Sequence, residues 1–257
     1  MHTIGIVNYN SHLKIKQFLI SVKKYNYIRI YIYDNNSKTH SKNMLKSYKK
    51  EFHQVQKIIF GKKNIGFGRS HNKIIELIRG FSSYHHIVNP DIEILSDNFF
   101  ENIENDFSKF YSYAMVPRIV NSLNLETFNS KKFPTLISLL ISRLFHNPNK
   151  SKYFNLINGS ESPVSKYHSV QVSSGAYIIL RKEFFVNFLP FDNRFFLYFE
   201  DVDFFKSIWR KKMDCLYNPN LVVKHLINRE SNRNFRLFLI HLWSFILYLL
   251  KWGIKIY

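Results

Sequence analysis

The first half of the chain alternates strand-like and helix-like segments, and no other feature narrows its possible folds as much. Short apolar or alternating runs predict strands at 2–9, 28–34, 55–60, 85–89 and 112–119. Helical periodicity fills the intervals at 11–25, 38–52, 68–80 and 97–109. Because short connections join these segments, we expect an α/β fold with a mostly parallel central sheet flanked by helices.

Residues 119–168 interrupt this alternation. They are rich in Asn, Ser, Lys and Pro around one apolar segment at 133–145. Regular patterns resume at 169–181, and a strand is predicted at 215–225. We therefore expect one domain over 1–231 that carries a variable insertion at 119–168.

The C-terminal residues 232–257 form a separate unit, predicted to be helical from Asn234 onward. The helix is apolar around most of its surface and carries one thin polar stripe, formed by His241, Ser244, Tyr248, Lys251 and Lys255. Its uninterrupted apolar part is shorter than the roughly 20 residues that cross a bilayer, and no acidic residue follows Glu230. This pattern is typical of an amphipathic helix lying in a membrane interface. The alternative is a helix packed on the domain or on a second subunit.

The chain is strongly basic, with 37 Lys and Arg against 18 Asp and Glu in 257 residues. Such a charge fits an anionic membrane, a nucleic acid, or the codon bias of an AT-rich genome, which the many Lys, Asn, Ile, Phe and Tyr suggest. The lysines are scattered, which argues against nucleic acid. The single cysteine, Cys215, excludes an intrachain disulfide and fits a reducing compartment, and no secretory signal is visible.

Polar residues follow each of the first four predicted strands. In a parallel sheet these ends meet at one edge, where ligands bind. The residues are Tyr9, Asp34, the turn Gly66–Arg69 with Asn72 beyond it, and the pair Asn89 and Asp91. Each set alone fits an ordinary turn, but their convergence favours a ligand site.

These residue types suggest roles at a nucleotide site. Tyr9 could stack on a base, and Asp34 could accept a hydrogen bond from a base imide. Gly66 would let the backbone approach a ligand, with Arg69 near phosphate. Asp91 could hold a divalent cation that bridges a diphosphate, since such cations prefer carboxylate oxygens. The turn matches neither a Walker loop nor a GxGxxG fingerprint.

Three acidic residues, Glu200, Asp201 and Asp203, crowd together behind the aromatic run Phe195–Phe199. Neighbouring carboxylates beside aromatic rings tend to have raised pKa values, and such a group can take a proton at neutral pH. The alternative is that they merely favour the positive end of the following helix.

Seven short motifs in this order resemble the inverting glycosyltransferases of family 2, most of all their rhamnosyltransferase-like branch, in which Asn-Pro-Asp replaces Asp-x-Asp. The motifs are IVNYNS, YDNNS, NIGFGRSHN, VNPD, SSGAYIILRKEFF, FDNRFFLYFEDVDF and VVKH, and they span about 2–231. The resemblance implies a GT-A, Rossmann-like fold, a nucleoside-diphosphate sugar donor (a dTDP- or UDP-sugar) and a divalent cation, Mn or Mg.

The resemblance also implies site residues, taken position by position. Tyr9 and Asp34 match base-binding residues, and Asn89 and Asp91 match the metal and ribose–diphosphate motif. Ser174, Gly175 and Ala176 match the acceptor-side turn, to which Glu200 is also assigned. Asp201 matches the general base, and His225 matches a residue near the metal or diphosphate.

Two departures matter. First, Leu226, Ile227 and Asn228 follow His225 at positions where family members often carry glycines. Second, Asn89 is uncharged where the Asp-x-Asp motif has a carboxylate, so metal binding rests on Asp91 with His225.

The sequence thus predicts a metal-assisted, inverting hexosyltransferase that acts on a glycan or polyprenyl-linked acceptor in bacterial surface polysaccharide synthesis, with rhamnose as one option for the sugar. We expect it to be cytoplasmic and peripheral on the inner face of the plasma membrane. The alternatives are a basic nucleic-acid-binding protein and an inactive membrane-peripheral scaffold.

Overall fold

The computed structural model of the chain describes residues 1–127, 131–135, 165–226 and 235–253. All the strands and helices predicted up to β4 are present, within a few residues of their expected bounds. They are β1 His2–Asn8, α1 His12–Ser21, β2 Ile28–Asp34, α2 Thr39–Glu51, β3 Val55–Phe60, α3 Phe67–Ile78 and β4 Tyr84–Val88.

The remaining elements include short ones that the sequence patterns did not predict, namely β5, β7 and α7. In chain order they are β5 Ile92–Ile94, α4 Phe99–Lys109, β6 Ala114–Val120, β7 His168–Ser169, β8 Tyr177–Arg181, α7 Lys182–Phe185, α8 Glu200–Arg210, β9 Cys215–His225 and α9 Phe235–Trp252. Residues 136–145 of the apolar segment predicted at 133–145, and most of the 119–168 insertion, lie outside the described residues.

Among the described residues, one sheet has nine strands in the order β3-β2-β1-β4-β8-β6-β9-β5, with β7 also pairing with β9. The strands from β3 to β4 are parallel, as expected. However, β8 lies antiparallel between β4 and β6, and β5 and β7 run antiparallel to β9. The α/β class and the mostly parallel sheet are confirmed, because among the described strands only β5, β7 and β8 run against the common direction of the other six.

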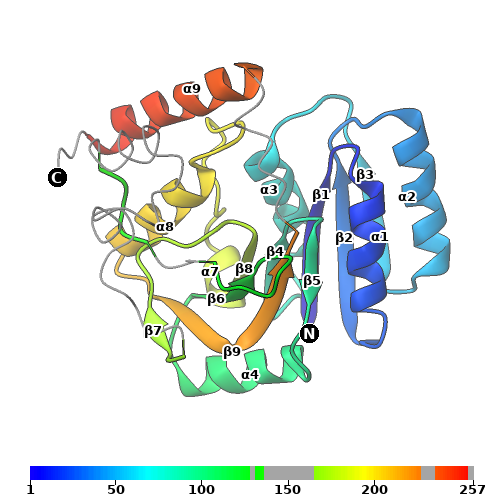
Figure 1. Cartoon of the computed structure of the whole chain (residues 1–257), viewed down its shortest axis with the longest axis horizontal. Helices are drawn as coiled ribbons and strands as arrows, with labels where there is room; N and C mark the ends of the chain where they lie inside the picture. Colours follow the sequence, from blue (N-terminus) through cyan, green and yellow to red (C-terminus); the bar gives the residue numbers. More distant parts are fainter. Residues whose placement is uncertain (128–130, 136–164, 227–234, 254–257) are drawn as a thin grey trace.

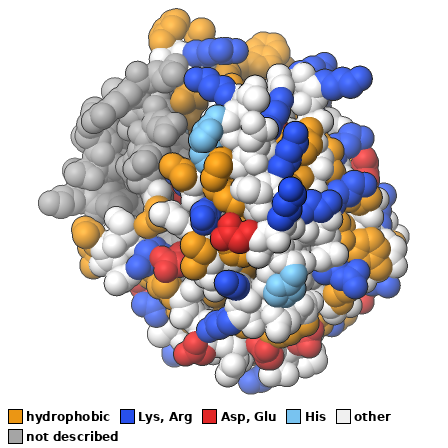
Figure 2. Space-filling model, turned by 90° about the vertical axis from the view of Figure 1, so that its right-hand side faces the viewer, with side chains coloured by type: hydrophobic (Ala, Val, Ile, Leu, Met, Phe, Trp, Pro, Cys, Tyr) orange, Lys and Arg blue, Asp and Glu red, His pale blue; other side chains and the backbone are white. Residues whose placement is uncertain are grey.

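The alternation of β2 explains why the sheet has a core on each face. Ile28, Ile30 and Ile32 point into a core shared with α1, α2 and α4. Tyr31 and Tyr33 point to the other face, into a core shared with α3, α7 and α8. Side chains along a strand alternate between its two faces, so burying both sets requires helices on both sides. On the face around α2, Lys and Arg predominate among the charged side chains and stand among hydrophobic ones (Figure 2).

Helix α9 lies beyond α8, at the end of the molecule away from α2 (Figure 1). It packs with its polar stripe inward: Ser244 and Tyr248 are buried, and the side chain of Lys251 is largely covered. Its outer face is apolar and exposed, through Phe235, Leu239, Leu242, Trp243, Ile246 and Leu250. The helix therefore has the reverse of the usual arrangement, in which the apolar face is buried.

The expectation that this segment is too short to span a membrane needs correction. The 18 residues of α9 have a mean hydropathy of 1.4, and only 11% of them are buried. Length and composition alone would therefore let this helix cross a bilayer. Core helices of other proteins pass the same criterion, but those are mostly buried.

Three histidines are fully buried on the two faces of the sheet: His71 and His85 lie beside Gly5 of β1 on the α3 side, and His86 lies on the other side against Phe100 of α4. His85 bonds Thr3 Oγ1 at 2.9 Å, and His86 bonds Tyr177 Oη at 3.0 Å. Within the described residues, neither ring nitrogen of His71 has a hydrogen-bond partner. Burial lowers the pKa of His85 to about 3 and also lowers the pKa values of His71 and His86, with help from neighbouring histidines.

We predict that these buried histidines make the fold less stable in mild acid. Below a pH near 6.5 the unfolded chain binds protons at these histidines, whereas the folded chain does not until pH falls well below that. The free energy of unfolding should therefore decrease from about pH 6.5 downward, by up to ~1.4 kcal/mol per pH unit for each histidine. Denaturant unfolding at stepped pH measures this slope. His71→Leu keeps the apolar contacts and should reduce it; an unchanged slope would contradict the prediction.

Candidate active site

The carboxyl ends of β1 and β2 are joined by a buried polar network. Asn8 Nδ2 donates to Asp34 Oδ1 at 2.7 Å and to Ser37 Oγ at 2.9 Å. The amide of Ser37 donates to Asp34 Oδ2 at 3.1 Å, and that of Asn10 to Ser37 Oγ at 2.8 Å. Asp34 itself has no exposed surface. Its carboxylate thus fixes the loop after β1, and contact with a base would require this network to open.

Tyr9 stands at this edge with 55% of its surface exposed. It follows directly on Asn8, whose network holds the loop. A stacking role for Tyr9 is sterically open and stays a prediction.

The glycines at the start of α3 leave space that another part of the chain fills. A Cβ on Gly66 would lie 2.1 Å from the carbonyl oxygen of Phe196, and Gly66 has φ of 90°. The amide of Phe67 donates to that same oxygen at 3.1 Å. A Cβ on Gly68 would lie 2.8 Å from Cβ of Phe191. These glycines therefore let residues 191–199, here called the aromatic segment, pack against α3.

Arg69 and Asn72 hold the same segment. Asn72 is buried and its Nδ2 donates to the carbonyl of Phe191 at 2.7 Å, while Arg69 Nε donates to the carbonyl of Asn193. The structure therefore gives Gly66, Arg69 and Asn72 a packing role that the sequence analysis did not foresee, and their donor-binding role stays a prediction. Their side chains and backbone are used to seat the aromatic segment, because the space beside Gly66 is already filled by Phe196.

Asp91 and His225 meet, as the sequence predicts. Asp91 Oδ1 lies 3.2 Å from His225 Nε2, and Oδ2 lies 3.3 Å from Lys14 Nζ. Burial alone would raise the pKa of Asp91, but His225 and Lys14 together hold it below its usual value. The amide of Asn89 donates to the carbonyl of Ala176 at 2.9 Å, which ties the motif to the turn before β8.

Lys14 is a member of this group that the sequence analysis missed. The signal for it was its place in the first turn of α1 after the β1 strand end, since that turn opens onto the same edge.

These residues fit a divalent cation as a partial ligand set. Among the described residues, no group of three or more His, Cys, Asp or Glu side chains gathers at one point. Asp91 and His225 supply two ligands of suitable type. Cations such as Mg²⁺ are often held by one or two protein ligands, with substrate phosphates and water completing the shell.

Asp201 lies in the first turn of α8 and faces the turn before β8. Its Oδ2 accepts a hydrogen bond from the amide of Gly175 at 3.1 Å, and its Oδ1 from the amide of Val202 at 2.8 Å. A Cβ on Gly175 would lie 2.9 Å from Cβ of Asp201, so only glycine allows this approach. Ser174 Oγ accepts from the amide of Ala176 at 3.2 Å and shapes the turn.

Glu200 has a different environment from Asp201. It is 7% exposed, and within the described residues its Oε2 has no hydrogen-bond partner. Burial and the charge of Asp201 raise the pKa of Glu200 to about 8. Desolvation also raises the pKa of Asp201, but the amides of Gly175 and Val202 oppose it. Near neutral pH the pair thus favours a protonated Glu200 beside an ionised Asp201.

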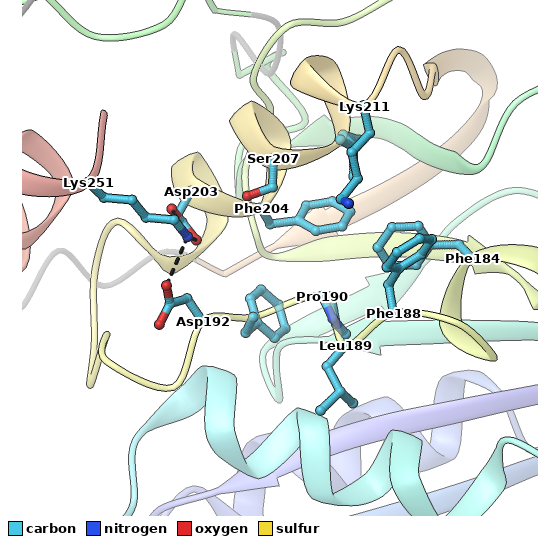
Figure 3. Close-up of a pocket in the computed structure, with 12 residues that line it drawn as sticks. Phe184, Phe188, Leu189, Pro190, Asp192, Asp203, Phe204, Ser207, Lys211 and Lys251 are labelled. Atoms are coloured by element: carbon cyan, nitrogen blue, oxygen red, sulfur yellow. Dashed lines mark hydrogen bonds and ion pairs between the residues drawn. The ribbon is translucent and has the colours of Figure 1, made fainter. Parts of the chain in front are cut away.

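A cavity of about 240 Å³ lies on another side of α8, between α7 and the C-terminal end of α9. Figure 3 shows Phe184, Phe188 and Lys211 at one end and Lys251 beside Asp192 and Asp203 at the other. Neither Asp201 nor Asp91 lines it. The cavity is therefore separate from the edge described above.

A sequence model described as glycosyltransferase-like family 2 matches residues 2–239. The chain belongs to glycosyltransferase family 2. Rhamnosyltransferase WbbL of Escherichia coli (strain K12) is 24% identical over 197 residues, which is 72% of this chain and 70% of WbbL.

Solved structures share the fold of this family 2 glycosyltransferase. GalNAc-T7 with UDP, GalNAc and Mn²⁺ matches with a TM-score of 0.68 at 17% identity, over 90% of this chain and 44% of that one. Mannosyltransferase PcManGT from Pyrobaculum calidifontis, with GDP-Man and Mn²⁺, matches with a TM-score of 0.65 at 12% identity, over 96% and 64%. The chain spans less than two thirds of either protein. These likenesses confirm the GT-A fold.

We predict that Gly66→Ala disrupts the seating of the aromatic segment. The added methyl would overlap the carbonyl of Phe196, and a φ of 90° strains any side chain. The loss of unfolding free energy should be at least about 2 kcal/mol. Gly80→Ala is the matched control, since nothing lies within 4 Å of its Cβ position. It should change stability by less than about 1 kcal/mol. Equal effects of the two substitutions in denaturant unfolding would refute this packing.

Proposed function

We propose that this protein is an inverting glycosyltransferase that transfers a sugar from a nucleoside-diphosphate donor to a hydroxyl group of a glycan or lipid-linked acceptor. The observation that carries the proposal is the carboxylate of Asp201. This carboxylate lies in the first turn of α8 and accepts a hydrogen bond from the amide of Gly175. Its neighbour Glu200 is buried, and burial favours the protonated form of Glu200.

In this mechanism Asp201 takes the proton of the acceptor hydroxyl. The hydroxyl oxygen forms a bond to the anomeric carbon of the donor while the bond from that carbon to the diphosphate breaks. The electron pair leaves with the nucleoside diphosphate, and Asp201 later releases its proton to solvent. A single displacement inverts the anomeric configuration. General base catalysis of this kind contributes roughly 100- to 10,000-fold in rate.

The donor would lie at the edge formed by Tyr9, Asn89 and Asp91. Asp91 and His225 would hold a divalent cation, Mn or Mg, which would supply positive charge to the leaving diphosphate. Lys14, 3.3 Å from Asp91, adds a second positive charge on that side. The nucleotides and Mn²⁺ in the structural relatives support this assignment. Donors to test first are dTDP-rhamnose, supported by the likeness to WbbL, and UDP-sugars.

We further propose that α9 holds the enzyme on the inner face of the plasma membrane, where surface polysaccharide precursors are lipid-linked. Support comes from its exposed apolar outer face and from its charge. Its described residues include the exposed Arg236 and no acidic residue, which suits anionic lipids.

We predict that Asp201→Asn lowers kcat by about 100- to 10,000-fold and leaves donor binding nearly intact. Amide replacement removes the base but keeps the shape of the side chain. Release of nucleoside diphosphate from the donor panel measures turnover, and calorimetry with UDP or dTDP and Mn²⁺ measures binding. Asp97→Asn is the control, because the carboxylate of Asp97 is 91% exposed and pairs with Lys24 at the surface. Full turnover in Asp201→Asn would refute the base assignment, and loss of nucleotide binding would make Asp201 a ligand residue.

For the membrane, we predict that Trp243→Ser with Leu250→Ser weakens sedimentation with anionic vesicles by tenfold or more. Each apolar side chain withdrawn from lipid costs about 1.5–3 kcal/mol. The matched control is Tyr111→Ser with Leu123→Ser, since both residues are similarly exposed and neither belongs to α9. Phosphatidylcholine vesicles with and without phosphatidylglycerol separate the apolar from the charge contribution. If both double variants bind equally well, α9 is not the anchor.

A further inference from the structure

The inner face of α9 is built to contact the turn that leads into the catalytic carboxylates. Ser244 Oγ donates to the carbonyl of Leu197 at 2.8 Å. The ring of Phe199 lies 5.4 Å from that of Tyr248 and 5.6 Å from that of Phe245. These contacts fall on the three residues before Glu200, so α9 touches the chain immediately ahead of the site.

That turn has a backbone conformation that needs support. Tyr198 has φ of 69° and Phe199 has φ of 62°, both in the left-handed region that large side chains avoid. Such residues persist only where their surroundings hold them, and they concentrate at functional sites. Phe199 is only 6% exposed, and its ring contacts include His241, Phe245 and Tyr248 of α9. Helix α9 is therefore a main support of the strained turn.

A charged bridge fixes the same helix to α8. Lys251 Nζ lies 2.8 Å from Asp192 and 2.8 Å from Asp203, and Trp252 Nε1 donates to Asp203 Oδ1 at 2.7 Å. Figure 3 shows Lys251 reaching between the two carboxylates. Asp203 is 1% exposed, so without Lys251 its charge would be buried beside that of Asp192. The bridge thus joins α9, the aromatic segment and the first turn of α8.

We propose that α9 positions the catalytic carboxylate. Ser244, Tyr248 and Lys251 hold the Tyr198–Phe199 turn and Asp203 in place, and through them set Asp201 against Gly175. These are positioning residues, since the contacts described for them are with the turn, Asp192 and Asp203 rather than with Asp201, Asp91 or Tyr9. The proposal rests on the proposed function for the role of Asp201, but the seating of the turn can be tested without it.

The experiment compares Lys251→Met with Lys251→Arg, Ser244→Ala and the control Lys49→Met, an exposed lysine of α2. All measurements use the full chain without lipid. Amide hydrogen exchange of peptides covering 197–202 and 173–176 reports the turn and its contact. Nucleoside-diphosphate release from the donor panel gives kcat and the donor KM, and calorimetry with UDP or dTDP and Mn²⁺ gives donor-side binding.

In Lys251→Met we expect faster exchange at 197–202 with little change in β1–β4. We expect kcat to fall about 10- to 100-fold, the range that a small displacement of a catalytic group produces, with donor KM and nucleotide binding nearly unchanged. Lys251→Arg keeps a cation between the two carboxylates and should retain most of kcat. Ser244→Ala removes only the bond to Leu197 and should show a smaller effect of the same sign; it decides the matter if Lys251→Met does not fold.

Unchanged exchange at 197–202 in Lys251→Met and Ser244→Ala would overturn the proposal. So would a uniform rise in exchange across β1–β4, which means general destabilisation, or a rise in donor KM that matches the fall in kcat. If the wild type transfers no sugar from any donor, the proposed function fails, and the exchange pattern still decides whether α9 holds the turn.

Discussion

The backbone of Phe196 packs directly onto Gly66 at the N-terminus of α3, and the arrangement of the candidate site depends on this contact. The carbonyl of Phe196 occupies the place of a side chain on Gly66 and accepts the amide of Phe67. Asn72 holds the same segment at Phe191. The aromatic segment is thereby fixed to the parallel half of the sheet, and α8 can begin only where that segment ends.

Three carboxylates in one helical turn have three different environments. Asp201 accepts two backbone amides, Glu200 is buried with an oxygen that lacks a partner among the described residues, and Asp203 is bound by Lys251 and Trp252. Hydrogen bonds to the charged form stabilise the Asp201 anion, whereas burial favours neutral Glu200. Burial raises the pKa of Asp203, and the hydrogen bonds from Lys251 and Trp252 oppose that rise. The turn thus separates the proposed base, a neighbour that favours its protonated form, and an anchor for α9.

The sequence predicted what depends on local pattern and missed what depends on distant packing. Strand periodicity predicted β1 to β4. The order of motifs assigned Asp91, His225, Asp201 and Gly175 to the site, and in the structure Asp91 contacts His225 and Asp201 contacts Gly175. The antiparallel direction of β8 was not predicted, because the residue pattern of a single strand does not reveal its neighbours or its direction in the sheet. The role of Gly66 was missed because its neighbour lies about 130 residues later. The polar stripe of α9 was recognised, but a stripe does not reveal which side is covered. Roles in substrate binding stay predictions.

The most direct test of this account is the ionisation order of Glu200 and Asp201. Carboxyl ¹³C NMR of the free enzyme follows both groups with pH, and spectra of Glu200→Gln and Asp201→Asn assign them. The account predicts that Asp201 loses its proton first as pH rises, and that Glu200 follows at a pH near 8. If Glu200 ionises first, or if Asp201 still holds its proton at neutral pH, Asp201 is not poised to act as the base and the account is contradicted.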